Sequence, residues 1–387
     1  MEQCDIAIVG AGMVGAATAC LLAAEGLNVR VIETRLPEHY APDQPLDLRV
    51  SAISQASVAL LDKAGAWSHL QQMRLCPYRR LETWELDGFA TRFDAADLGL
   101  PQLGYIIENR LVQLALLRRM EDFPNIQTHT PAAVARLQQG AEHASLLLDD
   151  GTELQARWVL ACDGAESLTR RLAGIGVSRF EYRQHCMLIN IDTDFAQEDI
   201  TWQQFTPSGP RAFLPLPGRH GSLVWYDSPA RIRALAAMGN EALAAEVRRH
   251  FPARLGGFQV TGKGSFPLVR RHANHYHAGR VVLLGDAAHT INPLAGQGVN
   301  LGFKDVACWT ELLGKAGADW HDITLASRYE RRRRPDNLLM QSGMDLFYGV
   351  FSNEIGPLRL ARNLALNLAD KAGPLKEMAL RYALGLV

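Results

Sequence analysis

The N-terminal part of this 387-residue chain contains three closely spaced glycines between two short apolar runs. The first run, Ile-Ala-Ile-Val at 6–9, is typical of a buried parallel strand. The glycines lie in Gly-Ala-Gly-Met-Val-Gly at 10–15, an alanine-rich helical stretch follows, and the second run, 28–32, ends at Glu33. A strand, a glycine turn, a helix, a second strand and an acidic residue in this order predict a Rossmann-type α/β unit that binds a dinucleotide.

Each part of this unit has a role toward a dinucleotide. The first glycine permits the tight turn, the second lets the backbone approach a pyrophosphate, and the third lets the helix pack closely on the strand. The helix N-terminus presents free N–H groups to the pyrophosphate, and the acid accepts hydrogen bonds from the ribose. The predicted contacts are Gly10, Gly12, Met13, Val14, Gly15 and Glu33. This pattern alone does not distinguish FAD from NAD, and a turn that only packs a helix on a strand is the structural alternative.

The same region also has the length of a membrane span. Ile6 to Ala24 is a run of 19 residues without a charge. A secretory signal would begin with a basic segment, whereas Glu2 and Asp5 precede the run and the first basic residue is Arg30. We therefore assign the run to the strand, turn and helix.

Composition excludes several classes of protein. The chain has 40 Lys and Arg against 41 Asp and Glu, and the basic run at 331–334 is too short for a nucleic-acid site, so we read it as the solvated end of a helix. The six cysteines form no C-x-x-C pair, which argues against zinc or dithiol chemistry and indicates a reducing, cytoplasmic setting. His272, His275 and His277 lie beside two arginines, and we predict a solvated loop there and no metal site.

Two further motifs follow buried strands. Arg-Val-Val-Leu-Leu at 280–284 leads into Gly-Asp-Ala-Ala-His at 285–289, where Asp286 is placed to bind a polyol hydroxyl. A glycine-rich helix start follows, whose amides suit a polar ring edge; its predicted contacts are Pro293, Gly296, Gln297, Gly298, Val299 and Asn300. The other motif is Asp163-Gly164 within 158–170, with Ser167 and Arg170 downstream.

Together the three motifs resemble the flavoprotein aromatic hydroxylases that use one FAD domain. The resemblance implies that the segment around Asp286 contacts the FAD ribityl chain and that Asp163 and its neighbours support the flavin and a passing nicotinamide. Because the chain has one glycine fingerprint, no separate NAD(P)H domain is predicted. The resemblance further implies an α/β fold with a Rossmann-like FAD domain, an inserted antiparallel substrate sheet and a C-terminal helical tail. The predicted ranges are 1–75, 100–176 and 268–334 for FAD, 76–99 and 177–267 for the substrate, and 335–387 for the tail.

Other segments resemble one branch of this family, the ubiquinone-biosynthesis hydroxylases. They are 47–54, 77–84, 104–109, 202–207, 209–215 and 340–347. This resemblance implies NAD(P)H- and O₂-dependent hydroxylation of a polyprenyl benzoquinol through a flavin C4a-hydroperoxide, with the ring position open among sister enzymes. It also implies FAD contacts from Arg49 and Asn109. Val134 is either a backbone contact to adenine or a core valine.

The catalytic and substrate residues are less constrained. No Ser-His-Asp or paired-carboxylate set is visible, and His289 is either a proton-transfer base or a packing residue near the flavin loop. Candidate pocket residues on predicted antiparallel strands are Phe213, Leu214, Trp225 and Tyr226, with plain sheet core as the alternative. An isoprenoid reductase and a redox-inactive escort protein are the rival functions.

The C-terminal tail is basic and rich in leucine. From 355 to 387 it has five basic and two acidic residues. Its leucines at 358, 360, 364, 366, 368 and 380 are spread over helical stretches. Such a tail either rests on the inner membrane, contacts other ubiquinone-biosynthesis proteins, or packs on the FAD domain.

Overall fold

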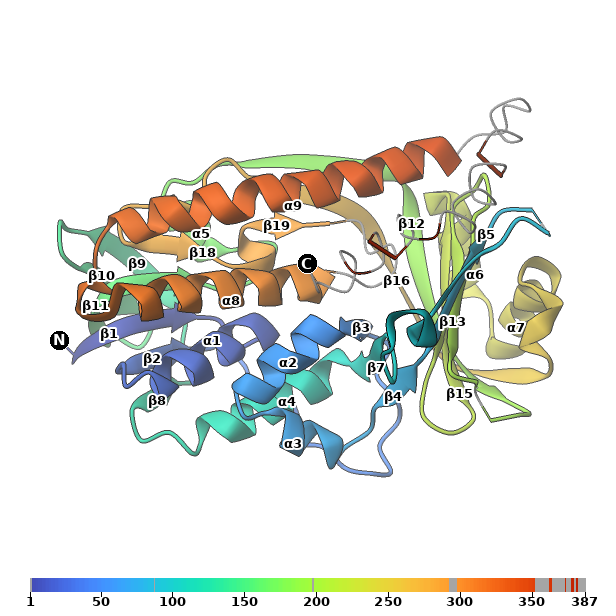
Figure 1. Cartoon of the computed structure of the whole chain (residues 1–387), viewed down its shortest axis with the longest axis horizontal. Helices are drawn as coiled ribbons and strands as arrows, with labels where there is room; N and C mark the ends of the chain where they lie inside the picture. Colours follow the sequence, from blue (N-terminus) through green and yellow to red (C-terminus); the bar gives the residue numbers. More distant parts are fainter. Residues whose placement is uncertain are drawn as a thin grey trace.

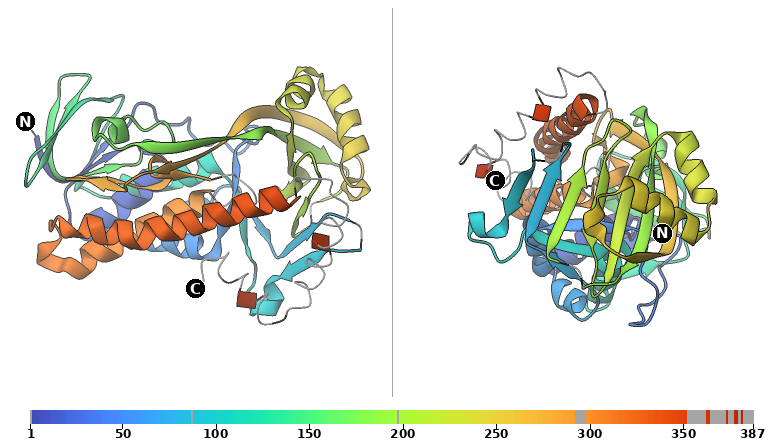
Figure 2. Two further views of the ribbon diagram at one scale, coloured as in Figure 1. Left: turned by 90° about the horizontal axis from the view of Figure 1, so that it is seen from above. Right: turned by 90° about the vertical axis from the view of Figure 1, so that its right-hand side faces the viewer.

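The computed structural model describes residues 2–86, 88–196, 198–291 and 298–351, together with 362, 363, 373, 377, 378 and 381. Within this part the chain forms three sheets and flanking helices (Figure 1). The shape is elongated, with one large sheet at each end and the cavity described below between them (Figure 2).

The first sheet contains the N-terminal unit. In order, its strands are β17 (His277–Ala278), β18 (Val281–Leu283), β11 (Glu153–Ala161), β1 (Glu2–Val9), β2 (Val29–Ile32) and β8 (Ile126–His129). The pairs from β18 to β8 are parallel, and β9 (Val134–Gln139) and β10 (Ala144–Leu148) extend the sheet antiparallel beside β11. Helices α1 (Met13–Ala24), α4 (Asn109–Met120) and α8 (Gly298–Ala316) share its hydrophobic core, which explains the apolar runs at both ends of the glycine turn.

The second sheet is almost entirely antiparallel. Its order is β19 (His289–Thr290), β16 (Phe258–Ala273), β12 (Val177–Thr193), β15 (His220–Asp227), β14 (Arg211–Pro215), β13 (Ile200–Gln204), β5 (Arg80–Trp84) and β6 (Thr91–Asp94). Helices α6 (Pro229–Ala237) and α7 (Asn240–His250) cover one of its faces, and the opposite face borders the cavity. The long paired strands β12 and β16 run from the first sheet to the second (Figures 1 and 2).

Smaller elements complete the fold. The third sheet has the order β3 (Val50–Ser54), β7 (Gly104–Glu108) and β4 (Cys76–Tyr78). Short helices are α2 (Gln55–Lys63), α3 (Trp67–Gln71), α5 (Leu168–Leu172) and the 3-10 turns Ala95–Leu98, Ala253–Leu255, Gly285–Ala287 and Gly317–Asp319. The last long helix, α9 (Thr324–Phe351), lies alongside α8 (Figure 1). None of the helices among the described residues has the length and apolarity to cross a bilayer.

Three sequence expectations need correction. The basic run at 331–334 lies inside α9 and not at the end of a helix. It is also not fully solvated, because Arg333 is buried and its guanidinium donates to Asp305 at 2.7 Å. The predicted boundary at 335 also falls within this helix, which continues through Pro335. His272 belongs to β16 and is buried against Gln341, whose side chain lies 2.8 Å from the imidazole Nδ1, so it is not part of a solvated loop.

Candidate active site

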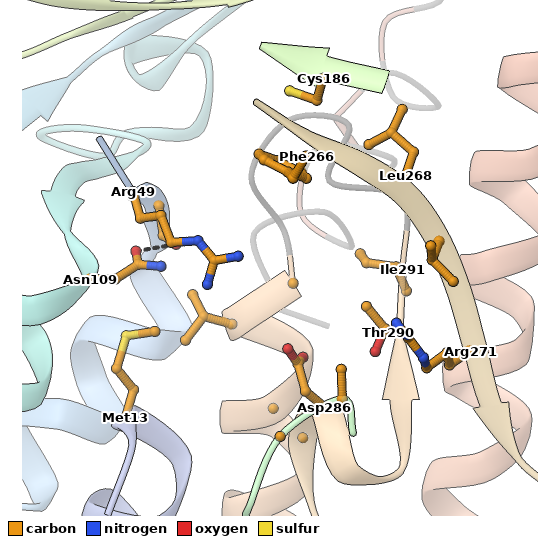
Figure 3. A pocket seen from close by; sticks show the side chains of 18 of the residues that line it. Met13, Arg49, Asn109, Cys186, Phe266, Leu268, Arg271, Asp286, Thr290 and Ile291 are labelled. Atoms are coloured by element: carbon orange, nitrogen blue, oxygen red, sulfur yellow. Dashed lines mark hydrogen bonds between the residues drawn. The ribbon is translucent and has the colours of Figure 1, made fainter. Parts of the chain in front are cut away.

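A cavity of about 800 Å³ lies where the carboxyl ends of β1, β11 and β18 face the second sheet (Figure 3). In parallel α/β sheets, ligands bind at this edge. One end is lined by Gly12, Met13, Val14, Cys162, Gly164, Gly285, Asp286, Gly298 and Val299. The other end is lined mainly by apolar side chains, with Gln203 among them: Cys186, Leu188, Gln203, Leu214, Val224, Tyr226, Phe266 and Leu268. The cavity therefore joins the glycine turn to an apolar wall.

The glycine turn has room for a ligand at one of its three positions. A Cβ at Gly10, whose φ is +100°, would lie 2.5 Å from the Cys162 carbonyl oxygen, and a Cβ at Gly15 would lie 1.9 Å from the Gly10 carbonyl oxygen. A Cβ at Gly12 would meet no protein atom within 4 Å, and Gly12 lines the cavity. No side chain caps α1, so its first N–H groups are open to an anion. These features fit a dinucleotide pyrophosphate.

Glu33 follows β2 and contacts the glycine turn through its carboxylate. One carboxylate oxygen accepts the Ala11 N–H at 2.7 Å, and the other accepts the Arg35 N–H at 2.9 Å. The side chain is half-buried, so it retains an exposed edge. Its contact to a ribose stays a prediction.

Asp286 follows β18 and faces the cavity (Figure 3). Desolvation by the surrounding protein raises the pKa of its carboxyl above the ordinary value. The turn that carries it packs tightly, because a Cβ at Gly285 would lie 3.0 Å from the Val14 side chain. The position fits the predicted role toward a polyol.

The Asp163 motif braces this turn instead of lining the cavity with its acid. The Asp163 carboxylate accepts the Ser167 hydroxyl at 2.5 Å and the Thr169 N–H at 3.0 Å, so it fixes the start of α5. The buried Arg170 donates to the Ala287 carbonyl at 2.8 Å. Gly164 lines the cavity and Asp163 holds the segment that follows it, and the supporting role of Asp163 toward a flavin stays a prediction.

Arg49 and Asn109 lie together at the cavity wall (Figure 3). The Asn109 N–H donates to the Arg49 carbonyl at 3.0 Å, and the Ser51 hydroxyl donates to the Asn109 side-chain oxygen at 2.7 Å. Both side chains are therefore placed where the sequence predicts a flavin, and a contact from either one stays a prediction.

The remaining predicted cofactor residues have mixed placements. The Asn300 amide donates to the Ala52 carbonyl at 2.8 Å, and its oxygen accepts the Ser57 hydroxyl at 2.7 Å, so this side chain links α8 to β3 and α2. Val134 is 3% exposed and packs in the first core, which matches the core alternative for its side chain. Pro293, Gly296 and Gln297 lie outside the described residues.

His289 belongs to a buried polar network behind the cavity. It is 2% exposed, and its Nε2 lies 2.5 Å from the Asp305 carboxylate. Asp305 also accepts the Arg333 guanidinium and the Gly285 N–H. Burial alone would raise the pKa of Asp305, but His289 and Arg333 together hold it below the ordinary value. This geometry supports the packing alternative for His289.

The four residues predicted to line the substrate pocket lie on opposite faces of the second sheet. Leu214 and Tyr226 line the cavity. Phe213 and Trp225 are their strand neighbours, and both lie in the core beneath α6 and α7, so predicting them as pocket residues was wrong. The cause is strand alternation, because adjacent side chains point to opposite sides of a sheet.

Sequence reasoning missed the side chains that β12 and β16 contribute to the cavity. These are Cys186, Leu188, Phe266 and Leu268. Cys186 lies opposite Tyr226 on one side and opposite Phe266 on the other, so the three form one row across the sheet. The spacing of two along each strand puts these side chains on one face, but it does not identify that face as the cavity side because both faces are apolar.

Comparison with known proteins agrees with this geometry. Residues 3–340 match the FAD binding domain family. The chain is 50% identical to the 3-demethoxyubiquinol 3-hydroxylase of Escherichia coli (strain K12) over 100% of this chain and 99% of that protein. It is 37% identical to the ubiquinone hydroxylase UbiL of Rhodospirillum rubrum over 98% of this chain and 89% of that protein.

A solved structure supports the fold. The p-nitrophenol 4-monooxygenase PnpA from Pseudomonas putida DLL-E4 matches with a TM-score of 0.80 over 99% of both chains, at 22% sequence identity. The chain therefore belongs to the FAD-dependent monooxygenases of ubiquinone biosynthesis.

Proposed function

We propose that this protein hydroxylates the ring of a polyprenyl benzoquinol, at the step performed by 3-demethoxyubiquinol 3-hydroxylase. The observation that carries the proposal is the continuity of the cavity from Gly12 and Asp286 to the apolar wall of the second sheet. In such a cavity a flavin held at the polar end would leave the apolar end for the quinol ring. The 50% identity to the Escherichia coli enzyme supports this ring position over that of a sister enzyme.

Bound FAD, once reduced by NAD(P)H, supplies the activation of O₂ that lets one oxygen atom be transferred to an electron-rich ring. The chain provides placement and a dry environment. Gly12 and the start of α1 suit the pyrophosphate, Asp286 suits the ribityl chain, and Arg49 lies at the flavin end. Leu188, Phe266 and their apolar neighbours exclude water from the ring.

A peripheral contact with the inner membrane or with other ubiquinone-biosynthesis proteins is part of the proposal. The basic tail and the polyprenyl chain of the substrate support it. Two described tail residues, Arg362 and Asn363, bind Glu85 at the end of the substrate sheet, with Arg362 Nε at 2.7 Å. This contact places Arg362 and Asn363 beside the second sheet and supports a role of the tail near the substrate region.

The membrane proposal has a direct test. The full chain should float with vesicles that contain anionic lipid, and salt should release it because the attraction is partly electrostatic. Equal flotation with neutral vesicles at high salt would contradict the role given to the basic tail.

The ring position is tested by deleting the gene and identifying the quinone precursor that accumulates. Accumulation of the 3-demethoxy precursor, reversed by the gene in trans, is the expected result. Accumulation of a precursor that lacks a different ring hydroxyl would assign the chain to a sister step.

A further inference from the structure

Tyr226 has a buried hydroxyl that the fold leaves unsatisfied. Its side chain is 1% exposed and lines the cavity from β15. Within the part of the chain that the structure describes, its hydroxyl oxygen has no hydrogen-bond partner. Buried polar groups are nearly always paired, and leaving one unpaired is costly, so this hydroxyl calls for a partner that the protein itself does not provide.

The position of the ring is fixed by its neighbours. Tyr226 packs in one cluster with Tyr182, Cys186 and Leu268. A Cβ added at Gly209 would lie 2.7 Å from the Tyr226 Cβ, so the backbone of that turn closes over the strand. Since Tyr226 lines the cavity, the cavity is the side from which a ligand would approach the hydroxyl.

The hydroxyl is a hydrogen-bond donor at neutral pH. Burial, helped by the nearby Cys186 and Tyr182, raises the pKa of Tyr226 well above its ordinary value, so the proton stays on the oxygen. The residues in its row across the sheet, Cys186 and Phe266, have no oxygen in their side chains. An oxygen-bearing ring in this end of the cavity has Tyr226 as its nearest strong donor in that row.

We propose that the Tyr226 hydroxyl hydrogen-bonds to an oxygen on the aromatic ring of the substrate, orients that ring, and selects oxygenated rings over hydrocarbons. The inference rests on the proposed function, since it names how the quinol is held. It also gives a function to a hydroxyl whose neighbours in the row across the sheet, Cys186 and Phe266, cannot satisfy it.

The test is anaerobic ligand binding to the oxidised, FAD-loaded full chain, without NAD(P)H. The two probes are a short prenyl-substituted 1,4-benzoquinol and the matching prenyl-substituted benzene. The Kd of each probe is measured by calorimetry and by the change in flavin absorbance. In wild type the quinol should bind more tightly. Tyr226→Phe should weaken quinol binding about three- to tenfold, as expected for one hydrogen bond, and leave the benzene unchanged.

Tyr182→Phe is the matched control. The Tyr182 hydroxyl donates to Asp345 and does not line the cavity, so this change should lower thermal stability and leave the preference for quinol intact. Tyr226→Phe removes a hydroxyl that has no partner in the described protein, so the ligand-free variant should not lose stability. Tyr226→Met is a second variant without the hydroxyl and should lose the same preference.

The inference is overturned if Tyr226→Phe keeps the wild-type preference, if it weakens both probes equally, or if it lowers FAD affinity while quinol binding is unchanged. Failure of the proposed function looks different. In that case wild type itself neither binds nor converts the quinol, whatever residue 226 is.

Discussion

The buried carboxylate of Asp305 offers a sharp test of how the site is built. Four donors converge on it: the Gly285 N–H at 3.0 Å, His289 Nε2 at 2.5 Å, Arg333 Nε at 2.7 Å and Asn337 Nδ2 at 3.2 Å. They come from the turn before Asp286, from β19 and from α9. Asp305→Asn keeps the size of the side chain, removes the charge and turns one acceptor into a donor.

The expected loss follows from the burial of the partners. Asp305 is 0% exposed and Arg333 is 7% exposed, so the substitution leaves a buried cation without one of its carboxylates. Breaking a buried pair costs about 3–5 kcal/mol, and the remaining contact of Arg333 with Asp336 places the cost near the lower limit, about 3 kcal/mol. For a domain of roughly 200 residues this corresponds to a fall of about 6–12 °C in Tm.

Thermal unfolding of the FAD-loaded protein measures this loss, with Glu311→Gln on the same helix as the control. Glu311 is paired with Lys315 at the surface, so its substitution should cost less than about 1 kcal/mol. FAD affinity should fall in Asp305→Asn alone, because the carboxylate holds the Gly285 N–H beside Asp286. Equal shifts in Tm for the two variants would refute the reasoning.

The pH dependence supplies an independent check on Asp305. Its pKa is lowered in the folded state, so its contribution to stability is complete above the ordinary carboxyl pKa of about 4 and is lost as the pH falls through the lower folded value. The difference in stability between wild type and Asp305→Asn should therefore be constant near neutral pH and narrow in acid. A difference that grows as the pH falls toward 4 would contradict this assignment.

Three further substitutions have defined outcomes. Asp286→Ala should weaken FAD binding by at least about tenfold, measured by flavin fluorescence titration, and undiminished affinity would remove this residue from the cofactor site. Gly15→Ala would place a Cβ 1.9 Å from the Gly10 carbonyl oxygen. The purified variant should therefore contain less FAD and unfold at a lower temperature than wild type. A variant with full FAD content and unchanged Tm would show that the turn tolerates a side chain. Glu85→Gln takes a carboxylate from the buried Arg362, so limited proteolysis should cleave the tail faster, and unchanged cleavage would argue against this anchor.

Much of the cofactor site could be predicted because binding a dinucleotide depends mainly on the conformation of the backbone at the strand ends. The glycine turn, the open space at Gly12 and the position of Asp286 depend on residues that are close in sequence to the strand ends that carry them. The parallel order of β18, β11 and β1 brings three such ends to one edge, so motifs far apart in the chain meet.

The substrate end was harder because both faces of the second sheet are apolar. Phe213 and Trp225 pack against helices while Leu214 and Tyr226 face the cavity, and hydrophobicity does not separate the two sides. The side-chain role of Asn300 depends on contacts with residues 52–57, which are more than 240 positions away. Neither arrangement has a local signal in the sequence.

Incorporation of oxygen tests the central claim most directly. Purified, FAD-loaded protein supplied with NAD(P)H, a polyprenyl benzoquinol and isotopically labelled O₂ should form a hydroxylated quinol that carries one labelled oxygen atom, detected by mass spectrometry. Two results would contradict assignment of the chain as a quinol hydroxylase. One is a product with a reduced prenyl chain and no label. The other is the absence of any labelled product although the flavin is reduced by NAD(P)H and reoxidised by O₂.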